Sequence, residues 1–137
     1  MKLNEVEDLI IKHEGFRKIP YLCSAGRLTI GYGRNISDKG ITKEEADFLL
    51  KEDIMKCVID LDAFIFPGLF KDWDNRLQHA MIDMRFQLGI RGFRNFKKMI
   101  SALRKNDRKL AATEAVDSIW FKQVPNRAKT IVKMIRG

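Results

Sequence analysis

The first 35 residues contain apolar residues at two different spacings. The first set repeats at helical spacing and comprises Leu3, Val6, Leu9 and Ile10. Gly15 follows as a natural stop, so this pattern predicts an amphipathic helix that ends at Glu14. Strand-forming residues then follow between Phe16 and Asn35, namely Ile19, Tyr21, Leu28, Ile30 and Tyr32. With a turn at residues 24–26, they predict a small antiparallel sheet.

A loop is expected at residues 35–41, which are rich in turn-forming side chains. Thr42 and Glu45 then have the spacing of a capping box, the signature of a helix start. The buried stripe of this helix is predicted at Ala46, Leu49, Leu50, Ile54, Cys57, Val58 and Leu61. The helix should run to about Phe64, because Pro67 and Gly68 then break the pattern.

The remaining sequence predicts only helices. Their expected ranges are residues 75–88, 93–104, 107–117 and 126–135, with breaks at residues 89–92, at Asn106 and at Pro125. The predicted fold class is therefore α+β, with one domain over residues 1–137. We expect a small antiparallel sheet lobe at about 16–41, a connecting helix at about 43–64, and a helical lobe at about 65–137 that also takes the N-terminal helix.

Composition and charge narrow the choice of partners. With 45% hydrophobic and 32% charged residues the chain has an ordinary globular composition, and its net charge of +8 favours an anionic partner. Charge alone leaves nucleic acid, acidic lipid and the bacterial envelope open. One alternative is a non-catalytic basic helical module that binds nucleic acid or anionic membrane through residues 91–108 and 127–136. No zinc-finger, RNA-recognition or basic-zipper pattern supports it.

Cysteine and histidine usage gives no sign of a metal or other cofactor. Cys23 and Cys57 match neither a disulfide framework nor a zinc spacing, and we expect both to be reduced thiols. His13 and His79 are far apart, with no further ligand at suitable spacing. The start MKLNEVEDLI does not read as a signal peptide, and no segment has the roughly 20 apolar residues of a membrane span. We therefore expect a soluble cytoplasmic product without stable membrane insertion.

Glu14 is unusual because a carboxylate at a helix C-terminus faces the negative end of the helix dipole. It begins residues 14–34, EGFRKIPYLCSAGRLTIGYGR, which resemble the active-site segment of phage lysozymes in glycoside hydrolase family 24. Glu14, Cys23 and Thr29 stand at the family's spacing before Ile-Gly-Tyr-Gly, with Cys in place of the catalytic Asp of many relatives. Further segments that resemble the family, the last two especially its T-even phage members, are ITKEEADFLL, DMRFQLG and SIWFKQVPNRA.

The resemblance implies a lysozyme-like fold and a muramidase, or endolysin, that hydrolyses the β-1,4 bond between N-acetylmuramic acid and N-acetylglucosamine. Glycoside cleavage needs one group to protonate the leaving oxygen and another to place a nucleophile. Glu14 is the expected proton donor. From residue type alone, Cys23 would be a small packing residue and Thr29 a strand former. The resemblance instead implies that both residues position the attacking water. Attack by this water would invert the configuration at the anomeric carbon.

The resemblance also implies a set of substrate contacts. Gly33, Phe86 and Gln87 are expected to line the cleft, and Arg127 to approach Glu14. Trp120 is assigned to the core. The chain departs from common family residues at Arg34, Asp83 and Glu114.

The expected partner is bacterial peptidoglycan, with no nucleic acid, and the expected state is a monomer. A phage protein of this kind would lie in the host cytoplasm until a phage pore protein releases it to the cell wall. There it would cause lysis. The alternative route to the wall is incorporation in the virion.

Overall fold

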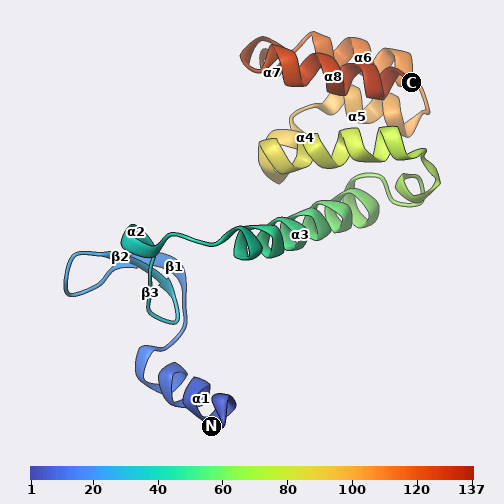
Figure 1. The fold of residues 1–137 in the computed structure, drawn as a ribbon. Coiled ribbons are helices and arrows are strands. Elements are labelled where there is room, and N and C mark those ends of the chain that lie inside the picture. The colour runs from blue at the N-terminus through green and yellow to red at the C-terminus, as the bar shows by residue number, and fades with distance from the viewer. The chain divides into compact units, whose positions relative to one another are not determined.

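A helix and a three-stranded sheet form the first part of the chain. The computed structural model describes residues 1–137, and their contacts divide them into two units, Met1–Phe48 and Leu49–Gly137. The elements of the first unit before the long helix are α1 (Leu3–Glu14), β1 (Arg17–Leu22), β2 (Leu28–Gly31), β3 (Arg34–Asn35) and α2 (Ile36–Lys39) (Figure 1). Helix α1 and the sheet follow the sequence prediction.

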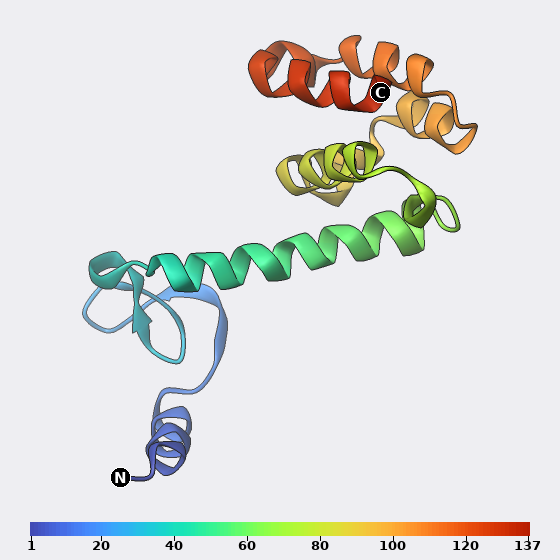
Figure 2. The same cartoon turned by 45° about the vertical axis from the view of Figure 1, so that its right-hand side comes forward.

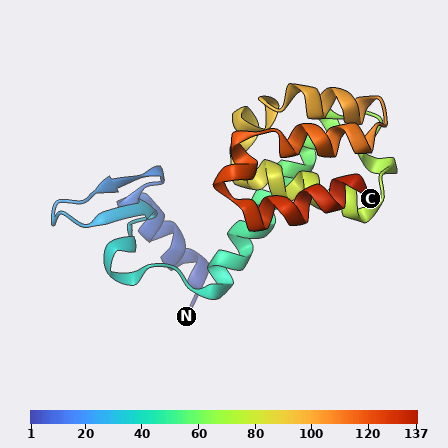
Figure 3. The same cartoon turned by 90° about the horizontal axis from the view of Figure 1, so that it is seen from above.

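The sheet has the order β1-β2-β3, and both pairs of strands are antiparallel. The hairpin of β1 and β2, seen from above in Figure 3, places Tyr21 opposite Thr29. Its turn is closed by the Cys23 N–H, which donates to the Arg27 carbonyl over 3.0 Å, and by the Gly26 N–H, which donates to the Cys23 carbonyl over 2.8 Å. The turn predicted at residues 24–26 is thus confirmed.

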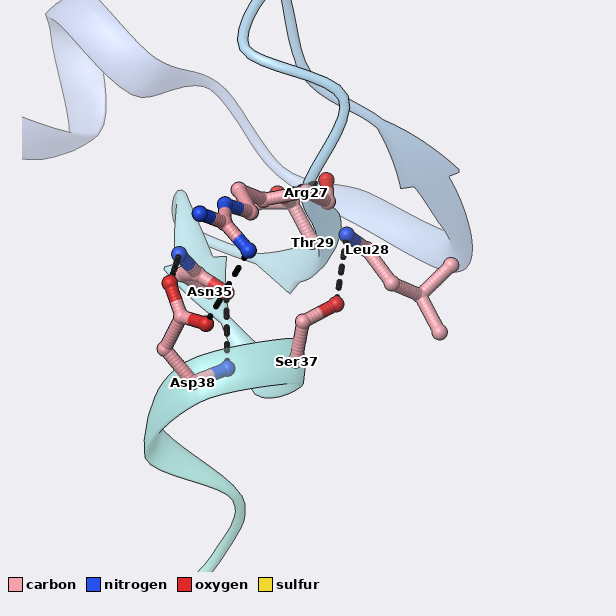
Figure 4. Close-up of polar contacts among 6 residues, drawn as sticks. All are labelled: Arg27, Leu28, Thr29, Asn35, Ser37 and Asp38. Atoms are coloured by element: carbon pink, nitrogen blue, oxygen red, sulfur yellow. Dashed lines mark hydrogen bonds and ion pairs between the residues drawn. The ribbon is translucent and has the colours of Figure 1, made fainter.

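The loop predicted at residues 35–41 is wrong in part, because residues 36–39 form the short helix α2. The Asn35 side chain accepts from the Asp38 N–H over 3.1 Å and donates to the Asp38 carboxylate over 2.8 Å. Ser37 Oγ accepts from the Leu28 N–H over 2.9 Å, which ties α2 to β2 (Figure 4). Asn, Ser and Asp serve both turns and helix caps, so their presence alone did not separate the two structures.

The capping box is confirmed at the start of α3 (Lys43–Ile59). The Glu45 N–H donates to Thr42 Oγ1 over 3.1 Å, and the Thr42 N–H donates to Glu45 Oε1 over 2.9 Å. The unit boundary falls inside this helix, and a π-helical segment, Asp60–Ile65, continues it to the predicted end. The predicted stripe is buried at Cys57 and Leu61, whereas Leu49 and Leu50 stay about half exposed.

Helices alone build the rest of the second unit (Figures 1 and 2). After a short 3-10 helix, Phe70–Asp72, they are α4 (Asn75–Arg94), α5 (Lys97–Arg104), α6 (Arg108–Val116), α7 (Ile119–Gln123) and α8 (Pro125–Arg136). Helix α8 packs against α4, α6 and α7, and α5 packs against α6. The largest fully buried side chains are Phe66, Phe93, Leu61, Leu77, Met81, Met84, Met99, Leu103 and Ile135.

Two details of this unit differ from the prediction. The chain leaves helical geometry only at Gly89 (φ 71°, ψ 168°) and resumes it as far as Arg94, so the helix expected from Phe93 begins at Lys97 instead. Phe93 is fully buried in the last turn of α4, which anchors that turn. Helix α7 was not predicted; Ser118 caps it by accepting from the Phe121 N–H.

The α+β class is confirmed, with a small antiparallel sheet and a long helix that runs from the first unit into the second. No helix combines the length and apolar character that a membrane span needs. The assignment of α1 to the helical lobe stays a prediction.

Asp74 gives a test of how α4 and α6 are held. It accepts from the Leu77 N–H over 3.0 Å and pairs with Arg108, which also donates to the Ile135 carbonyl of α8. The Leu77 N–H, then Arg108, hold the pKa of Asp74 below its usual value. Its stabilisation is therefore present above the unfolded-state pKa of about 4 and is lost as pH falls through the lower folded-state pKa.

We accordingly expect Asp74→Asn to lower the free energy of unfolding at pH 7, although the amide keeps a cap acceptor, and the deficit to shrink at acidic pH. Urea unfolding at both pH values measures it. Asp72→Asn, which changes a neighbouring carboxylate without such a pair, is the control. Equal effects of the two substitutions would contradict the assignment.

Candidate functional site

Glu14 is the last residue of α1, and its carboxylate lies against the turn between β2 and β3. A Cβ built on Gly33 would lie 2.6 Å from Glu14 Oε2 and 2.7 Å from its Cδ. Gly33 also has a left-handed backbone, with φ of 70°. The positive φ favours glycine at this position, and a Cβ there would also force the Glu14 carboxylate to move. Gly33, predicted as a substrate contact, therefore touches the predicted acid itself.

Cys23 and Thr29 meet at the hairpin of β1 and β2. Cys23 directly follows β1 and is half-buried, whereas Thr29 is central in β2 and only 4% exposed. The Thr29 hydroxyl donates to the Arg27 carbonyl over 2.9 Å (Figure 4). The same hydroxyl is among the groups that lower the pKa of the Cys23 thiol.

Hydrogen bonds at this turn favour the thiolate of Cys23. The Arg27 N–H, followed by the Ala25 N–H, lowers the pKa of the Cys23 thiol, and the Thr29 hydroxyl adds to the effect. Partial burial acts in the opposite direction. At Cys57 burial dominates and raises the thiol pKa, with Arg85 opposing it. Only Cys23 thus has the environment of a reactive cysteine.

In the second unit, Phe86 and Gln87 follow one another on α4. Phe86 is 43% exposed, as a residue that contacts a ligand can be. Gln87 Oε1 accepts from Trp120 Nε1 over 3.0 Å, and the Trp120 ring packs edge-on against Phe96. Because an indole N–H only donates, this bond fixes the orientation of the Gln87 amide and leaves its NH2 group free to donate to a ligand. The core assignment of Trp120 is confirmed, since its ring is buried.

Arg127 lies at the start of α8, where its Nε donates to Asp83 Oδ1 of α4 over 2.8 Å. Sequence analysis singled out Asp83 only as a departure from common family residues. The pairing was missed because the two positions are 44 residues apart and only the packing of α8 on α4 joins them. The expected approach of Arg127 to Glu14 stays a prediction.

The other two departures also have defined surroundings. Arg34 forms an ion pair of 2.8 Å with Glu45 and donates to the Gly40 carbonyl, so it links β3 to the start of α3. Glu114 lines a hollow of about 650 Å³ together with Phe96 and Trp120. No group of three or more His, Cys, Asp and Glu side chains is placed to hold a metal ion.

Each unit therefore gathers part of the predicted set. The first holds Glu14 against Gly33 and joins Cys23 to Thr29, and the second holds Gln87 on Trp120 and Arg127 on Asp83. A helix that ends in a carboxylate, a small antiparallel sheet with a thiol and a hydroxyl on its hairpin, and a following helical unit are consistent with a lysozyme-like α+β protein. The phage lysozyme family model matches residues 11–133, and the chain belongs to this family.

Three relatives illustrate the range of the family. The chain is 27% identical over 96 residues to "Probable T4-type lysozyme 1" of Dictyostelium discoideum, and 31% identical over 106 residues to "Pre-baseplate central spike protein Gp5" of Enterobacteria phage T4. These matches take 69% and 75% of the chain but span only 56% and 18% of the two relatives. The chain is also 32% identical over 126 residues to "Endolysin" of Acyrthosiphon pisum secondary endosymbiont phage 1. This match covers 89% of the chain and 81% of that protein.

The contrast between the two thiols predicts their reactivity. We expect iodoacetamide to alkylate Cys23 at lower pH than Cys57 and much faster, because only the thiolate reacts and Cys57 is buried. Mass spectrometry of peptides after timed quenching measures both rates in one sample. Thr29→Val should move the Cys23 profile to higher pH and Thr29→Ser should restore it. A Cys23 profile unaffected by Thr29→Val would show that the hydroxyl does not act on the thiol.

Proposed function

We propose that the protein is a muramidase that hydrolyses the β-1,4 bond between N-acetylmuramic acid and N-acetylglucosamine in peptidoglycan. The observation that carries this proposal is the carboxylate of Glu14, which lies where a Cβ on Gly33 would meet it at 2.6 Å. Membership of the phage lysozyme family supports the same conclusion. Hydrolysis of this bond in the wall would lyse the cell.

In this proposal Glu14 is the general acid that protonates the leaving glycosidic oxygen. Its side chain is exposed to solvent at the end of α1, so substrate can reach it. Gly33 sets where the carboxylate lies and brings the backbone of its turn close to the bound sugar.

Cys23 and Thr29 place and activate the attacking water. A thiolate, favoured by the Arg27 and Ala25 N–H groups, can accept a proton from water or stabilise positive charge on the sugar. The Thr29 hydroxyl donates its proton to the Arg27 carbonyl, so its oxygen can accept from the same water and orient it. Attack by water on the face opposite the leaving group inverts the anomeric carbon.

The second unit supplies further contacts with the glycan. Phe86 offers an exposed ring for a sugar face, and the free NH2 of Gln87 suits an acetamido carbonyl. Arg127 is proposed to face Glu14, with Asp83 holding its guanidinium.

We further propose that the protein acts as a monomer on the wall and reaches it either from the host cytoplasm through a phage pore protein or as part of a virion. Relatives named endolysin and central spike protein agree with either route.

The proposed acid is tested by Glu14→Gln. The amide keeps the shape but cannot protonate the leaving oxygen, so the rate of lysis of permeabilised cells should fall by about 10²-fold or more. Glu7→Gln, which changes another exposed carboxylate of α1, should lyse cells at the parental rate. Activity of Glu14→Gln within a few-fold of the parent would remove Glu14 from this role.

The role of Gly33 is tested against Gly31. Both have left-handed backbones, with φ of 70° and 67°, but a Cβ on Gly31 meets no atom within 4 Å. Alanine at either position should cost roughly 1–2 kcal/mol of unfolding free energy. Only Gly33→Ala should also displace Glu14 and abolish lysis under conditions where both variants are folded. Equal activity of the two folded variants would contradict the argument.

Cys23 is tested by two substitutions. If it activates water, Cys23→Asp should keep substantial activity, because a carboxylate does the same work, and Cys23→Ala should lose about 10²-fold. A packing role predicts the reverse order, because burying a charge costs more than leaving a small cavity. Nuclear magnetic resonance of fresh product should show inversion; retention would instead indicate covalent attack by Cys23.

A further inference from the structure

The net positive charge of the protein comes entirely from the second unit. The first unit holds eight basic and eight acidic side chains, so the whole excess of +8 lies in residues 49–137. Within that unit the ion pairs with carboxylates occupy Arg85, Arg108, Arg127 and Lys71. The basic side chains of α5 have no carboxylate partner.

Helix α5 sorts its residues by face. Met99, Ile100, Ala102 and Leu103 are buried in the core. The opposite face exposes Lys97, Lys98, Ser101 and Arg104, and Lys105 follows at its end. Arg104 donates to the Ile65 carbonyl, a neutral acceptor, and forms no ion pair with a carboxylate. We call the exposed set, together with Arg94, the basic face of α5.

Two hollows flank this face, and each has an exposed apolar side chain at its wall. One, of about 350 Å³, is lined by Arg94, Lys97 and Arg104 together with Phe64, which is 62% exposed. The other, of about 300 Å³, is lined by Lys97, Lys98 and Lys105 together with Leu110, which is 45% exposed. Glu114 is the one carboxylate on either wall.

We propose that the basic face of α5 docks the protein on a membrane surface of anionic phospholipid. Lys and Arg at headgroup level attract anionic lipid, while apolar side chains beside them enter the acyl boundary. Phe64 and Leu110 are placed for that second role. A soluble polyanion or a nucleic acid would satisfy the cations equally but would leave both apolar side chains in water. The buried apolar side of α5 belongs to the core, so the helix binds from its polar side without insertion.

The binding strength follows from the number of cations. One Lys or Arg near an anionic bilayer contributes about 1 kcal/mol, or about fivefold in partitioning. The double variant Lys97→Gln/Lys105→Gln should therefore bind roughly 25-fold more weakly to vesicles of phosphatidylglycerol and phosphatidylcholine. Lys122→Gln/Lys129→Gln, which removes the same charge from exposed sites outside both hollows, should change binding only a few-fold. Co-sedimentation of the full chain at fixed salt measures both.

The apolar part is tested separately with Phe64→Ser, and the control is Met55→Ser, which changes another exposed apolar side chain. Phe64→Ser should weaken binding to these vesicles severalfold and leave binding to double-stranded DNA unchanged. Equal losses of vesicle binding in the two lysine double variants would overturn the proposal, because binding would then depend on overall charge and not on this face. Unchanged vesicle binding of Phe64→Ser would also overturn it, because a soluble polyanion would then be the better partner. The vesicles contain no peptidoglycan, so Glu14→Gln should bind them like the parent, and the result is independent of the proposed hydrolysis.

Discussion

The close approach of Glu14 to the backbone of Gly33 is the constraint on which the proposed chemistry depends. Helix α1 ends at Glu14, and the sheet must present a turn without a side chain where the carboxylate lies. The left-handed conformation of Gly33 and the missing Cβ meet this need together. A carboxylate at the C-terminal end of a helix is unfavourable for the stability of α1, and in the proposed function this position serves catalysis instead.

In the hairpin of β1 and β2, backbone N–H donors set the pKa of the Cys23 thiol. The backbone N–H groups of Arg27 and Ala25 lower the pKa of the Cys23 thiol, and the hydroxyl of buried Thr29 acts in the same direction. In the proposed function this thiol, as a thiolate, activates the attacking water. Ser37 of α2 accepts from the Leu28 N–H of β2, and Asp38 of α2 pairs with Arg27, which directly precedes β2. Helix α2 therefore supports the geometry of the site.

Local signals in the sequence predicted much of the fold. The capping box at Thr42, the turn at residues 24–26 and the helical stop at Gly15 are all set by neighbouring residues, and each is confirmed. Features set by packing were missed. Phe93 extends α4 because it is buried in the core, and α7 is too short to show a periodic pattern.

The candidate site divides in the same way. The spacing of Glu14, Cys23 and Thr29 is readable because these residues lie within one short segment. The contact of Gly33 with Glu14 depends on how the turn between β2 and β3 folds back to the end of α1. The bond from Trp120 to Gln87 and the pairing of Arg127 with Asp83 depend on how distant segments pack. Sequence could name the residues but not these partners, and the partners orient the side chains.

The central claim is that Glu14 drives cleavage of the glycan after N-acetylmuramic acid. Mass spectrometry of purified peptidoglycan, digested and then reduced with borohydride, tests it most directly. The account predicts soluble fragments that end in reduced N-acetylmuramic acid with the parent protein, and none above background with Glu14→Gln. Fragments that end in reduced N-acetylglucosamine, free stem peptides, or equal release by the two proteins would contradict it.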